Sequence, residues 1–411
     1  MTSKDNMIVL DKDVNIVYYK PVKEVLDFTL EKNAKMYFSN KEGLNVMDST
    51  FHVIDSFSCK NGVRYDPHDR LILPNGHLVL MGSEKVKIDL KVFPEWKKKC
   101  SNDTTGVVVS VLQEQDAQRN VVWEWHAKDH FAFVEADSFF DIHFSPPQWT
   151  HSNALTIDAD GNYIMSSRNF DEITKINHLD GSVMWRLGGI CNEFKLVNYT
   201  VPFYGQHNIR RIANGHFTLL DNGENTVKHG ARALEFELDE VKKTATLKWS
   251  YTFDPNVTST SRGSVQRLPD GNTLISYGIT SGADLCFVVV DSSGTKKFQA
   301  DYFHPNNFKV INYPSLPFQL HRPVISCFDS AGVKYLDAGS GYNSYKWNTG
   351  DSTRIIALKS SGSYSVFVPY GGAGGHISSE KYIVSDILKP CNLKSFKGRN
   401  KKSNGAGDKN N

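Results

Sequence analysis

The sequence predicts an all-β protein, a six-bladed β-propeller followed by a small immunoglobulin-like β-sandwich. Two observations lead to this expectation. Helical periodicity is nearly absent, and short runs rich in Val, Ile, Tyr, Phe and Thr alternate with turn residues, which is the pattern of short strands. Similar turns also recur along the chain, at Asn75-Gly76, Asp160-Gly161, Asn214-Gly215 and Asp270-Gly271.

These turns predict both the hairpins and the repeat. Asn-Gly and Asp-Gly supply the positive φ angles that tight hairpin turns need. The turn glycines are separated by 85, 54 and 56 residues, which indicates a period of about 55 with one inserted segment. Repeats of about 40–55 residues with several strands each are typical of propeller blades. We therefore expect a propeller over residues 1–318.

The expected blades follow the turns in chain order. The clearest blade has strands at 151–158, 162–169, 172–178 and 183–189. Similar sets of strands are expected at 27–57, 60–127, 202–253 and from 262 onward. A hairpin over 7–20 and the segment 308–314 could together complete one more blade by closing the ring. That closure would bring the number of blades to six.

The sequence changes character over residues 321–392. Gly, Ser and Asn turns separate short strands there, and no blade-like hairpin is found. Cys327 and Cys391 flank Trp347, similar to the Cys…Trp…Cys plan of immunoglobulin-like sandwiches. A disulfide between these cysteines is a hypothesis, with two free thiols as the alternative. The Lys- and Asn-rich residues 393–411 predict a disordered tail.

Composition limits the function classes. The 411 residues carry a net charge of +2, which gives no electrostatic footprint for nucleic acid. No apolar run is long enough for a membrane span, and the first residues lack the apolar region of a signal peptide. The six cysteines are scattered without metal-ligand spacing, so neither zinc nor another cofactor is expected. The oligomeric state stays open.

Polar residues recur at one depth of the predicted channel. The first strand of each blade lines the channel, and its side chains alternate faces with period two. His68, Asn153 and His207 each lie seven residues before the turn Asn or Asp of their blade. His151 lies two residues before Asn153, on the same face and one pleat along.

The returning strands are expected to add further polar groups at this depth. Antiparallel counting about the turns places Arg168 opposite Asn153 and next to His151, and Asn222 opposite His207. Arg262 falls at the corresponding depth of the next blade. We do not expect a metal, because Arg168 would repel a cation and no carboxylate is expected at the level of the histidines. The cluster is instead expected to handle an anion, with Asn153, Asn222 and Arg262 as substrate-binding residues.

At these same residues the chain resembles the arylsulfotransferase family, whose members use aryl sulfates rather than the nucleotide donor PAPS. The matching stretches lie at 66–77, 149–189, 205–224 and 263–278. The resemblance implies a six-bladed propeller and a ping-pong transfer of a sulfuryl group from a phenolic sulfate ester to a phenol. It also implies a periplasmic or secreted protein.

The resemblance assigns roles residue by residue. His207 resembles the nucleophile that forms a transient sulfohistidine, and Arg168 resembles the sulfate-binding cation. His68 and His151 resemble the flanking histidines that contact the sulfuryl oxygens or handle the phenol proton. One departure is Pro67, which stands where the family often has a second histidine before the His-Asp pair.

Two other functions remain open at this point. The same channel could serve a hydrolase of another anionic ester, or it could bind a ligand without catalysis. A sulfuryl adduct on His207 would favour the sulfotransferase, release of free sulfate without an acceptor would favour the hydrolase, and an inert protein would favour the binding module.

Overall fold

The protein divides into two units in a computed structural model. Residues 1–320 with 370–375 form the first unit, and residues 321–369 with 376–411 form the second. The predicted tail, 393–411, lies outside the described residues. These are 2–3, 5–31, 33–98, 102–136, 146–223, 230–252, 257–281, 284–301, 307–389 and 391.

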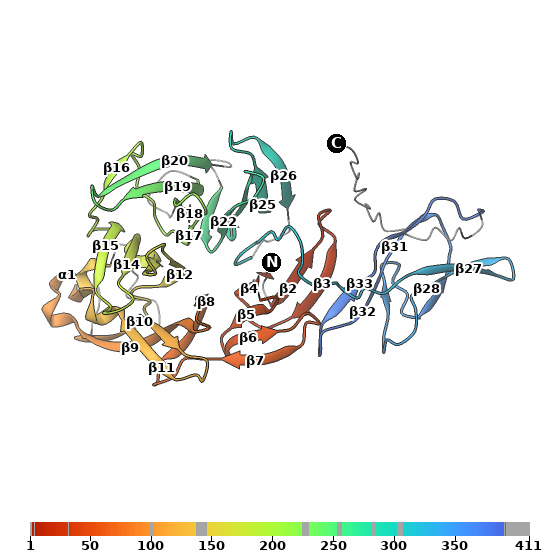
Figure 1. The fold of residues 1–411 in the computed structure, drawn as a ribbon, viewed down its shortest axis with the longest axis horizontal. Coiled ribbons are helices and arrows are strands. Elements are labelled where there is room, and N and C mark those ends of the chain that lie inside the picture. Colours follow the sequence, from red (N-terminus) through yellow and green to blue (C-terminus); the bar gives the residue numbers. More distant parts are fainter. Residues whose placement is uncertain are drawn as a thin grey trace, which may run out of the picture. The chain divides into compact units, whose positions relative to one another are not determined.

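The first unit is a β-propeller, with antiparallel sheets that surround a common centre (Figure 1). Blade 1 consists of β4 (Asp27–Leu30), β5 (Met36–Asn40), β6 (Gly43–Met47) and β7 (Val53–Phe57). Blade 2 consists of β8 (Arg64–Ile72), β9 (Leu78–Asp89), β10 (Thr104–Gln115) and β11 (Val121–His126). Blade 3 consists of β12 (Ser152–Ile157), β13 (Tyr163–Ser167), β14 (Glu172–Ile176) and β15 (Val183–Gly188).

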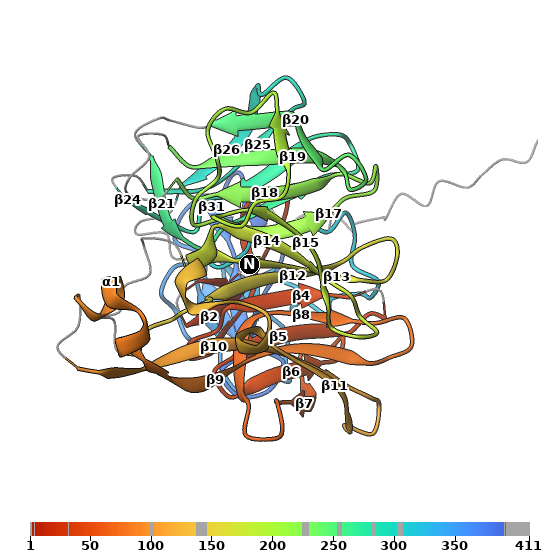
Figure 2. The same ribbon diagram turned by 90° about the vertical axis from the view of Figure 1, so that its left-hand side faces the viewer.

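Two more four-stranded blades follow, so that the described residues contain five. Blade 4 consists of β17 (His207–Arg211), β18 (Phe217–Asp221), β19 (Arg232–Asp239) and β20 (Thr244–Thr252), with β16 (Lys195–Val197) added in parallel to β20. Blade 5 consists of β22 (Ser264–Arg267), β23 (Thr273–Ser276), β25 (Leu285–Val290) and β26 (Lys296–Asp301). The first strands of consecutive blades contact one another around the centre. Figure 2 shows the blades from the side, in the colour order of the chain.

Short elements connect these sheets. The 3-10 turns are η1 (Leu90–Val92), η2 (Ala127–Asp129), η3 (Phe133–Glu135) and η4 (Arg168–Phe170), and the described α-helix is α1 (Pro94–Lys97). A two-stranded sheet is formed by β21 (Thr258–Ser261) and β24 (Ile279–Ser281). None of the described helices is long and apolar enough to cross a membrane.

Burial along the strands follows from their place in a blade. Every residue of β13 and β14 is buried, whereas β15 alternates between buried and more accessible positions. A middle strand is covered by the neighbouring blades on both faces, so it needs no polar face. The large apolar clusters therefore lie between consecutive blades. Trp125 of blade 2, for example, packs in such a cluster and donates from Nε1 to the Gly181 carbonyl of blade 3 at 2.9 Å.

The predicted turn dipeptides all form tight turns. Their glycines have φ angles between 84° and 87°, which a residue with a Cβ rarely adopts. The strands predicted for blade 3 are confirmed to within a few residues at each end.

The predicted ring closure stays a prediction, and its two segments differ in structure. The N-terminal hairpin is present as β2 (Asn6–Leu10) and β3 (Ile16–Pro21), with β1 (Thr2–Ser3) beside β2, but residues 308–314 form no strand. Their backbone bonds to side chains of β22 instead, with Val310 N bonding to Ser264 Oγ and Asn312 N to Gln266 Oε1. The Phe308 carbonyl also accepts from Gly263 N, directly before β22, at 3.1 Å. The count of six blades stays a prediction.

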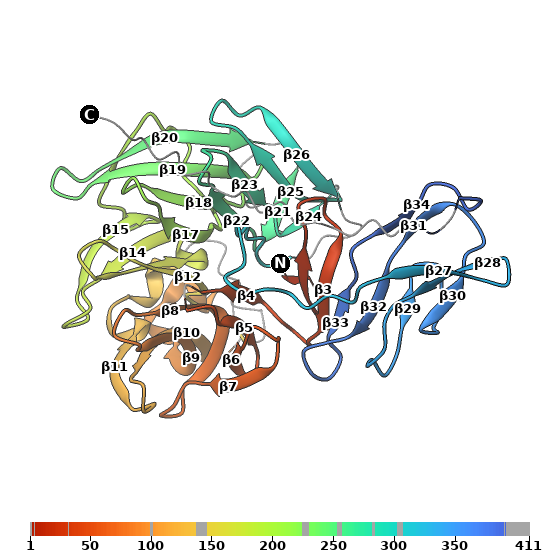
Figure 3. The same cartoon turned by 45° about the vertical axis from the view of Figure 1, so that its right-hand side comes forward.

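The second unit is a set of small antiparallel sheets (Figure 3). One contains β27 (Ser326–Ser330), β28 (Val333–Asp337) and β30 (Ile355–Ala357), and another contains β29 (Lys346–Trp347), β32 (Val366–Pro369) and β33 (His376–Ser378). A third pairs β31 (Gly362–Tyr364) with β34 (Tyr382–Val384). Trp347 is buried, and Cys327 is bonded to Cys391. The hypothesis of this disulfide is confirmed, while the immunoglobulin-like topology stays a prediction.

Candidate active site

Three histidines from consecutive blades meet in the first unit. His68 lies on β8, His151 directly precedes β12, and His207 begins β17. The ring centroids of His68 and His151 are 5.1 Å apart, and those of His151 and His207 are 6.5 Å apart. The cluster that the turn counting predicted is therefore present, with His151 in the middle.

Each of the three first strands is irregular at this level. The register shifts between Tyr65 and Arg70 in β8, between Ser152 and Ala154 in β12, and between His207 and Arg210 in β17. Such irregularities re-aim side chains and are frequent beside active sites. The backbone of His151 is also left-handed, with φ 46°, an unfavourable conformation that the surrounding structure must hold in place.

Two predicted strand pairings are wrong because of these register shifts. Arg168 does not lie opposite Asn153, because Ser167 pairs with Ser152 and Asn153 is the extra residue of the shift. Arg168 N instead donates to the His151 carbonyl at 3.1 Å, so its predicted place beside His151 is confirmed.

Asn222 does not lie opposite His207 either, because Leu220 is the register partner of His207. The side chain of Asn222 nevertheless reaches the ring, since its Oδ1 is 2.8 Å from His207 Nδ1. The predicted contact is therefore present, although the predicted register is not.

His207 is held in one orientation by two acceptors. Its Nδ1 lies 2.9 Å from the Gly205 carbonyl and 2.8 Å from Asn222 Oδ1. A carbonyl can only accept, so Nδ1 carries the proton and Nε2 has the free lone pair. The Asn222 amide is itself oriented, because its Nδ2 donates to Ser259 Oγ at 2.6 Å and to the Arg262 carbonyl at 3.0 Å. Gly205 is tied to blade 3, since its N–H donates to Asp171 Oδ1.

Burial keeps the His207 ring neutral. The residue is only 2% exposed, and its pKa is lowered to about 3, mainly by burial and then by the nearby charge of Arg168. The pKa of His151 is also well below its ordinary value, through burial and the charges of His68, Arg168 and His207. Both imidazoles are therefore uncharged at neutral pH.

Two arginines belong to the same region. Arg168 opens η4 directly after β13 and donates to Asn169 Oδ1 at 2.9 Å and, more weakly, to the Thr260 carbonyl at 3.5 Å. Burial lowers the pKa of Arg168 and also that of Arg262, yet guanidinium groups stay charged in proteins. Arg262, with φ 68°, is linked to His207 through its carbonyl contact with Asn222.

Asn153 is turned toward the segment that carries His207. Its Nδ2 donates to the Gln206 carbonyl at 2.7 Å, and the residue is 1% exposed. Within the described part of the chain its Oδ1 has no hydrogen-bond partner. Such an atom is costly to bury unsatisfied, so Asn153 has one acceptor left for a group that enters the site.

The expectation that no carboxylate lies beside the histidines is wrong. Asp66 Oδ1 accepts the His68 backbone N–H at 3.0 Å and contacts His68 Nδ1. Residues two apart on a strand share a face, so the rule that related His151 to Asn153 could also have found Asp66. In the described residues, no three or more His, Cys, Asp or Glu side chains are grouped so that they could hold a metal ion.

A buried ionic network lies next to the cluster in the sequence and was not predicted. Asp69 accepts from Leu155 N at 2.9 Å, pairs with Arg210 at 2.7 Å and pairs with Lys309 at 3.1 Å. Burial alone would raise the pKa of Asp69, but these two cations hold it well below its ordinary value. The network joins β8 to β12, to β17 and to the segment after blade 5, and so fixes the strands that carry the histidines.

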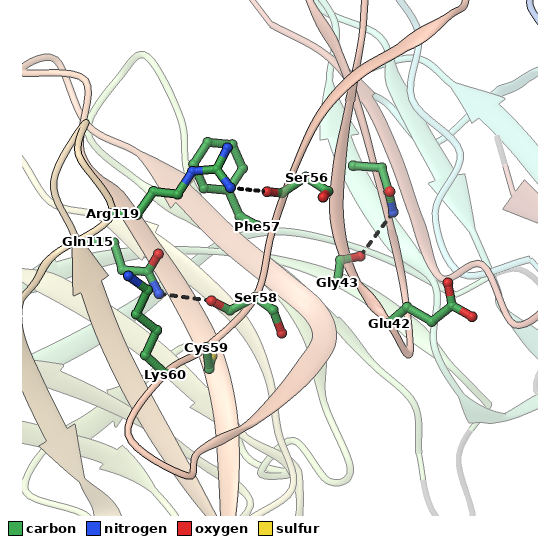
Figure 4. Close-up of a pocket in the computed structure, with 10 residues that line it drawn as sticks. Glu42, Gly43, Ser56, Phe57, Ser58, Cys59, Lys60, Gln115 and Arg119 are labelled. Atoms are coloured by element: carbon green, nitrogen blue, oxygen red, sulfur yellow. Dashed lines mark hydrogen bonds between the residues drawn. The ribbon is translucent and has the colours of Figure 1, made fainter.

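A separate cavity of about 410 Å³ lies away from these residues, between blades 1 and 2 (Figure 4). Phe57, Lys60 and Arg119 are among its lining residues, and no member of the histidine cluster is. Two of its polar side chains bond to backbone groups of the lining, since Gln115 Nε2 donates to the Ser58 carbonyl and Arg119 Nη1 to the Ser56 carbonyl, both at 2.9 Å. The histidine cluster, and not this cavity, therefore stays the candidate active site.

The fold and the cluster together define a propeller with a histidine–arginine site. The chain belongs to the arylsulfotransferase family, whose model, described as Arylsulfotransferase (ASST), matches residues 1–303. Membership supports an arylsulfotransferase function and phenolic small molecules as substrates. A comparison with curated proteins found no match.

Similar solved structures include three with low sequence identity. A protein of unknown function from Bacteroides caccae has 12% identity and a TM-score of 0.46, with 73% of this chain and 92% of that chain covered. A virginiamycin B lyase from Staphylococcus aureus has 9% identity and a TM-score of 0.40, with 91% and 98% covered. The Cps50 (Swd1) β-propeller domain of Myceliophteria thermophila has 7% identity and a TM-score of 0.43, with 81% and 86% covered. These scores are too low to support an argument about function.

Proposed function

We propose that the protein is an aryl-sulfate sulfotransferase that works by a ping-pong mechanism through a sulfohistidine at His207. The observation that carries the proposal is the state of this ring. Its Nδ1–H is bound by two acceptors, its pKa is about 3, its lone pair is on Nε2, and the charge of the partly buried Arg168 acts on the ring. A neutral, oriented imidazole is a nucleophile that can split one difficult displacement into two easier ones.

The two half-reactions balance at His207. The Nε2 lone pair attacks the sulfur of the phenolic sulfate, an N–S bond forms, and the S–O bond breaks with its electron pair on the phenol oxygen. Asn222 Oδ1 and the Gly205 carbonyl stabilise the positive charge that the ring gains, because both accept its Nδ1–H. An acceptor phenol then attacks the same sulfur, and the N–S electron pair returns to Nε2.

Arg168 supplies the charge that the transferring group needs. Sulfuryl transfer spreads negative charge over three oxygens, and fixed donors in a confined site stabilise that charge. A guanidinium presents two parallel donors that match two such oxygens. His151, neutral and adjacent to Arg168, provides a further donor, and we assign Asn153, Asn222 and Arg262 to the substrate-binding surroundings.

Mass spectrometry of the protein mixed with 4-nitrophenyl sulfate tests the proposal. We expect a sulfuryl adduct that maps to His207, and its loss when a phenol is added. The variant His207→Asn is the control and should carry no adduct. Free sulfate released without an acceptor would instead indicate a hydrolase, and an unmodified, inert protein would indicate a binding module.

We also propose that the protein works outside the cytoplasm, in the periplasm or as a secreted protein. The Cys327–Cys391 disulfide supports this placement, because structural disulfides persist mainly in oxidising compartments. The activity is assigned to the propeller at 1–318, with 321–392 as a separate domain. Detection of the disulfide in protein purified from its native host tests the placement, and two free thiols there would contradict it.

A further inference from the structure

Asp66 and His68 form a carboxylate–imidazole pair at the edge of the histidine cluster. A single oxygen, Asp66 Oδ1, accepts the His68 backbone N–H at 3.0 Å and contacts the ring at Nδ1. Pro67 stands between the two residues, and its fixed φ restricts the bend that brings them together. Both side chains are 22% exposed, so the pair lies where a phenol and a proton can reach it.

We propose that Asp66 is the positioning residue that makes His68 the proton carrier of the transfer reaction. The inference rests on the proposed function, and it assigns the transfer of the phenol proton to His68 within the same site. Asp66 fixes a proton on Nδ1 of His68, and this leaves Nε2 as the position where a second proton is gained or lost.

The three histidines differ in the partners of their rings, and this difference separates their roles. His207 has two neutral acceptors on Nδ1, whereas His68 has a carboxylate. The ring of His151 lies between them, and its pKa is held low by burial and by the charges of His68, Arg168 and His207. His151 therefore stays neutral and cannot start the reaction as an acid.

The proton balance closes over one cycle. In the proposed cycle His68 gives a proton from Nε2 to the phenol oxygen as the S–O bond breaks, and the ring keeps its proton on Nδ1. The acceptor phenol later returns a proton to Nε2 as its oxygen attacks the sulfur of sulfohistidine 207. Among the described residues, the titratable groups that act on His68 include Asp66 on its own strand and His151 and His207 from the neighbouring blades. The ring centroid of Phe308 lies 5.6 Å from that of His68.

A series of aryl sulfate donors tests the assignment with the variant Asp66→Asn. General acid catalysis matters most when the leaving phenol is a weak acid. We expect a loss in kcat of less than about tenfold with 4-nitrophenyl sulfate and of about a hundredfold with phenyl sulfate. The KM should change little, and Asp66→Glu should restore part of the rate, because a carboxylate is again within reach.

Glu84→Gln is the matched control. Glu84 Oε1 lies 2.7 Å from His126 Nδ1 in the same blade, and these side chains are 21% and 24% exposed, so this pair has the same chemistry and exposure away from the cluster. Glu84→Gln should leave kcat unchanged with every donor of the series. A double-mutant cycle with His68→Gln adds a second test, because Asp66→Asn should have no further effect once His68 is absent.

The outcomes separate the inference from the function. An equal loss with every donor, no loss with any donor, or additive effects in the cycle would overturn the role of Asp66 while the wild-type adduct at His207 remains. Absence of that adduct in the wild-type protein would instead overturn the proposed function. If Asp66→Asn fails to fold, the cycle is made with Asp66→Glu, which should lose its effect in the His68→Gln background.

Discussion

Two histidines of blade 4 lie nine residues apart on one hairpin and have opposite surroundings. His207, in the cluster, contacts the neutral acceptors Asn222 and Gly205. His216, after the turn, contacts the buried carboxylate of Glu235 at 2.8 Å. The residue type is the same, so its partners decide whether the imidazole can act as a nucleophile or is bound to a carboxylate.

The arrangement at the turns is repeated in blade 2. His77 follows the turn Asn75-Gly76 and lies 2.7 Å from Glu114, as His216 lies beside Glu235. Each glutamate also binds the next blade, Glu235 through Arg267 and Glu114 through Tyr163 and His178. These glutamates therefore join neighbouring blades, whereas the ring of His207 is held by the neutral Asn222 side chain and the Gly205 carbonyl.

The largest expected effect comes from the nucleophile itself. His207→Asn should lower kcat by about a thousandfold or more, because an amide nitrogen cannot replace the imidazole as the nucleophile. Steady-state transfer from 4-nitrophenyl sulfate to phenol measures the loss. His216→Asn, on the same hairpin, is the control and should keep the wild-type kcat. Comparable losses in both variants would remove the distinction between the two histidines.

Asn222→Asp should make His207 resemble His216. A carboxylate beside Nδ1 raises the pKa of His207 above about 3, because it favours the charged ring. The protonated ring has no lone pair, so the rate should now fall as the pH drops through the raised pKa. We expect a loss of about tenfold to a hundredfold at pH 5 that is recovered at higher pH.

The pH–rate profile of the adduct-forming step measures this change. In the wild-type protein His207 should contribute no acid limb above about pH 4, since its pKa is about 3. A profile of Asn222→Asp with the wild-type shape would mean that Asn222 does not control the ring.

The sequence predicted which residues lie close together, but not their strand register or the orientation of their side chains. Period-two counting from the turns brought His68, His151 and His207 together, and antiparallel counting about the turn of blade 3 added Arg168. The pairings failed because register shifts at Asn153 and after His207 insert extra residues, and no composition or spacing signals such a shift. Asp66 was missed although its position two residues before His68 was visible.

The strands of the blades were predictable for a different reason. Their turns need Gly at φ near 85°, and the apolar runs between turns reflect burial between blades. The glutamates at the turns were not predicted, because Glu114 and Glu235 are far in sequence from the histidines and arginine that bind them. Pairing of such distant residues depends on the packing of neighbouring blades.

Glu235→Gln should lower stability without lowering activity. Burial alone would raise the pKa of Glu235, but hydrogen bonds from His216, Arg267 and Asn214 outweigh it and lower the pKa. The carboxylate therefore stabilises the fold above its unfolded pKa of 4.5, and the stabilisation is lost as the pH falls through the folded pKa. We expect a loss of about 2–3 kcal/mol at pH 7.

Urea unfolding of this variant and of wild-type protein at pH 7 and at pH 4 measures the effect. The difference should shrink at the lower pH, where the wild-type carboxylate is also being protonated. A difference that stays constant with pH would mean that the charge of Glu235 is not what joins the blades.

The smallest expected effect is that of His216→Asn on stability. Its side chain is 18% exposed, and Glu235 keeps Arg267 and the Asn214 amide as partners when the ring is removed. The glutamate is then not left unsatisfied, so the loss should be about 0.5–1.5 kcal/mol, the net value of one hydrogen bond. The same denaturation at pH 7 measures it, and a loss as large as that of Glu235→Gln would contradict the expectation. His216→Asn should therefore change stability and activity little, whereas His207→Asn should abolish most of the activity. Only at His207 does the proposed chemistry depend on the imidazole ring itself.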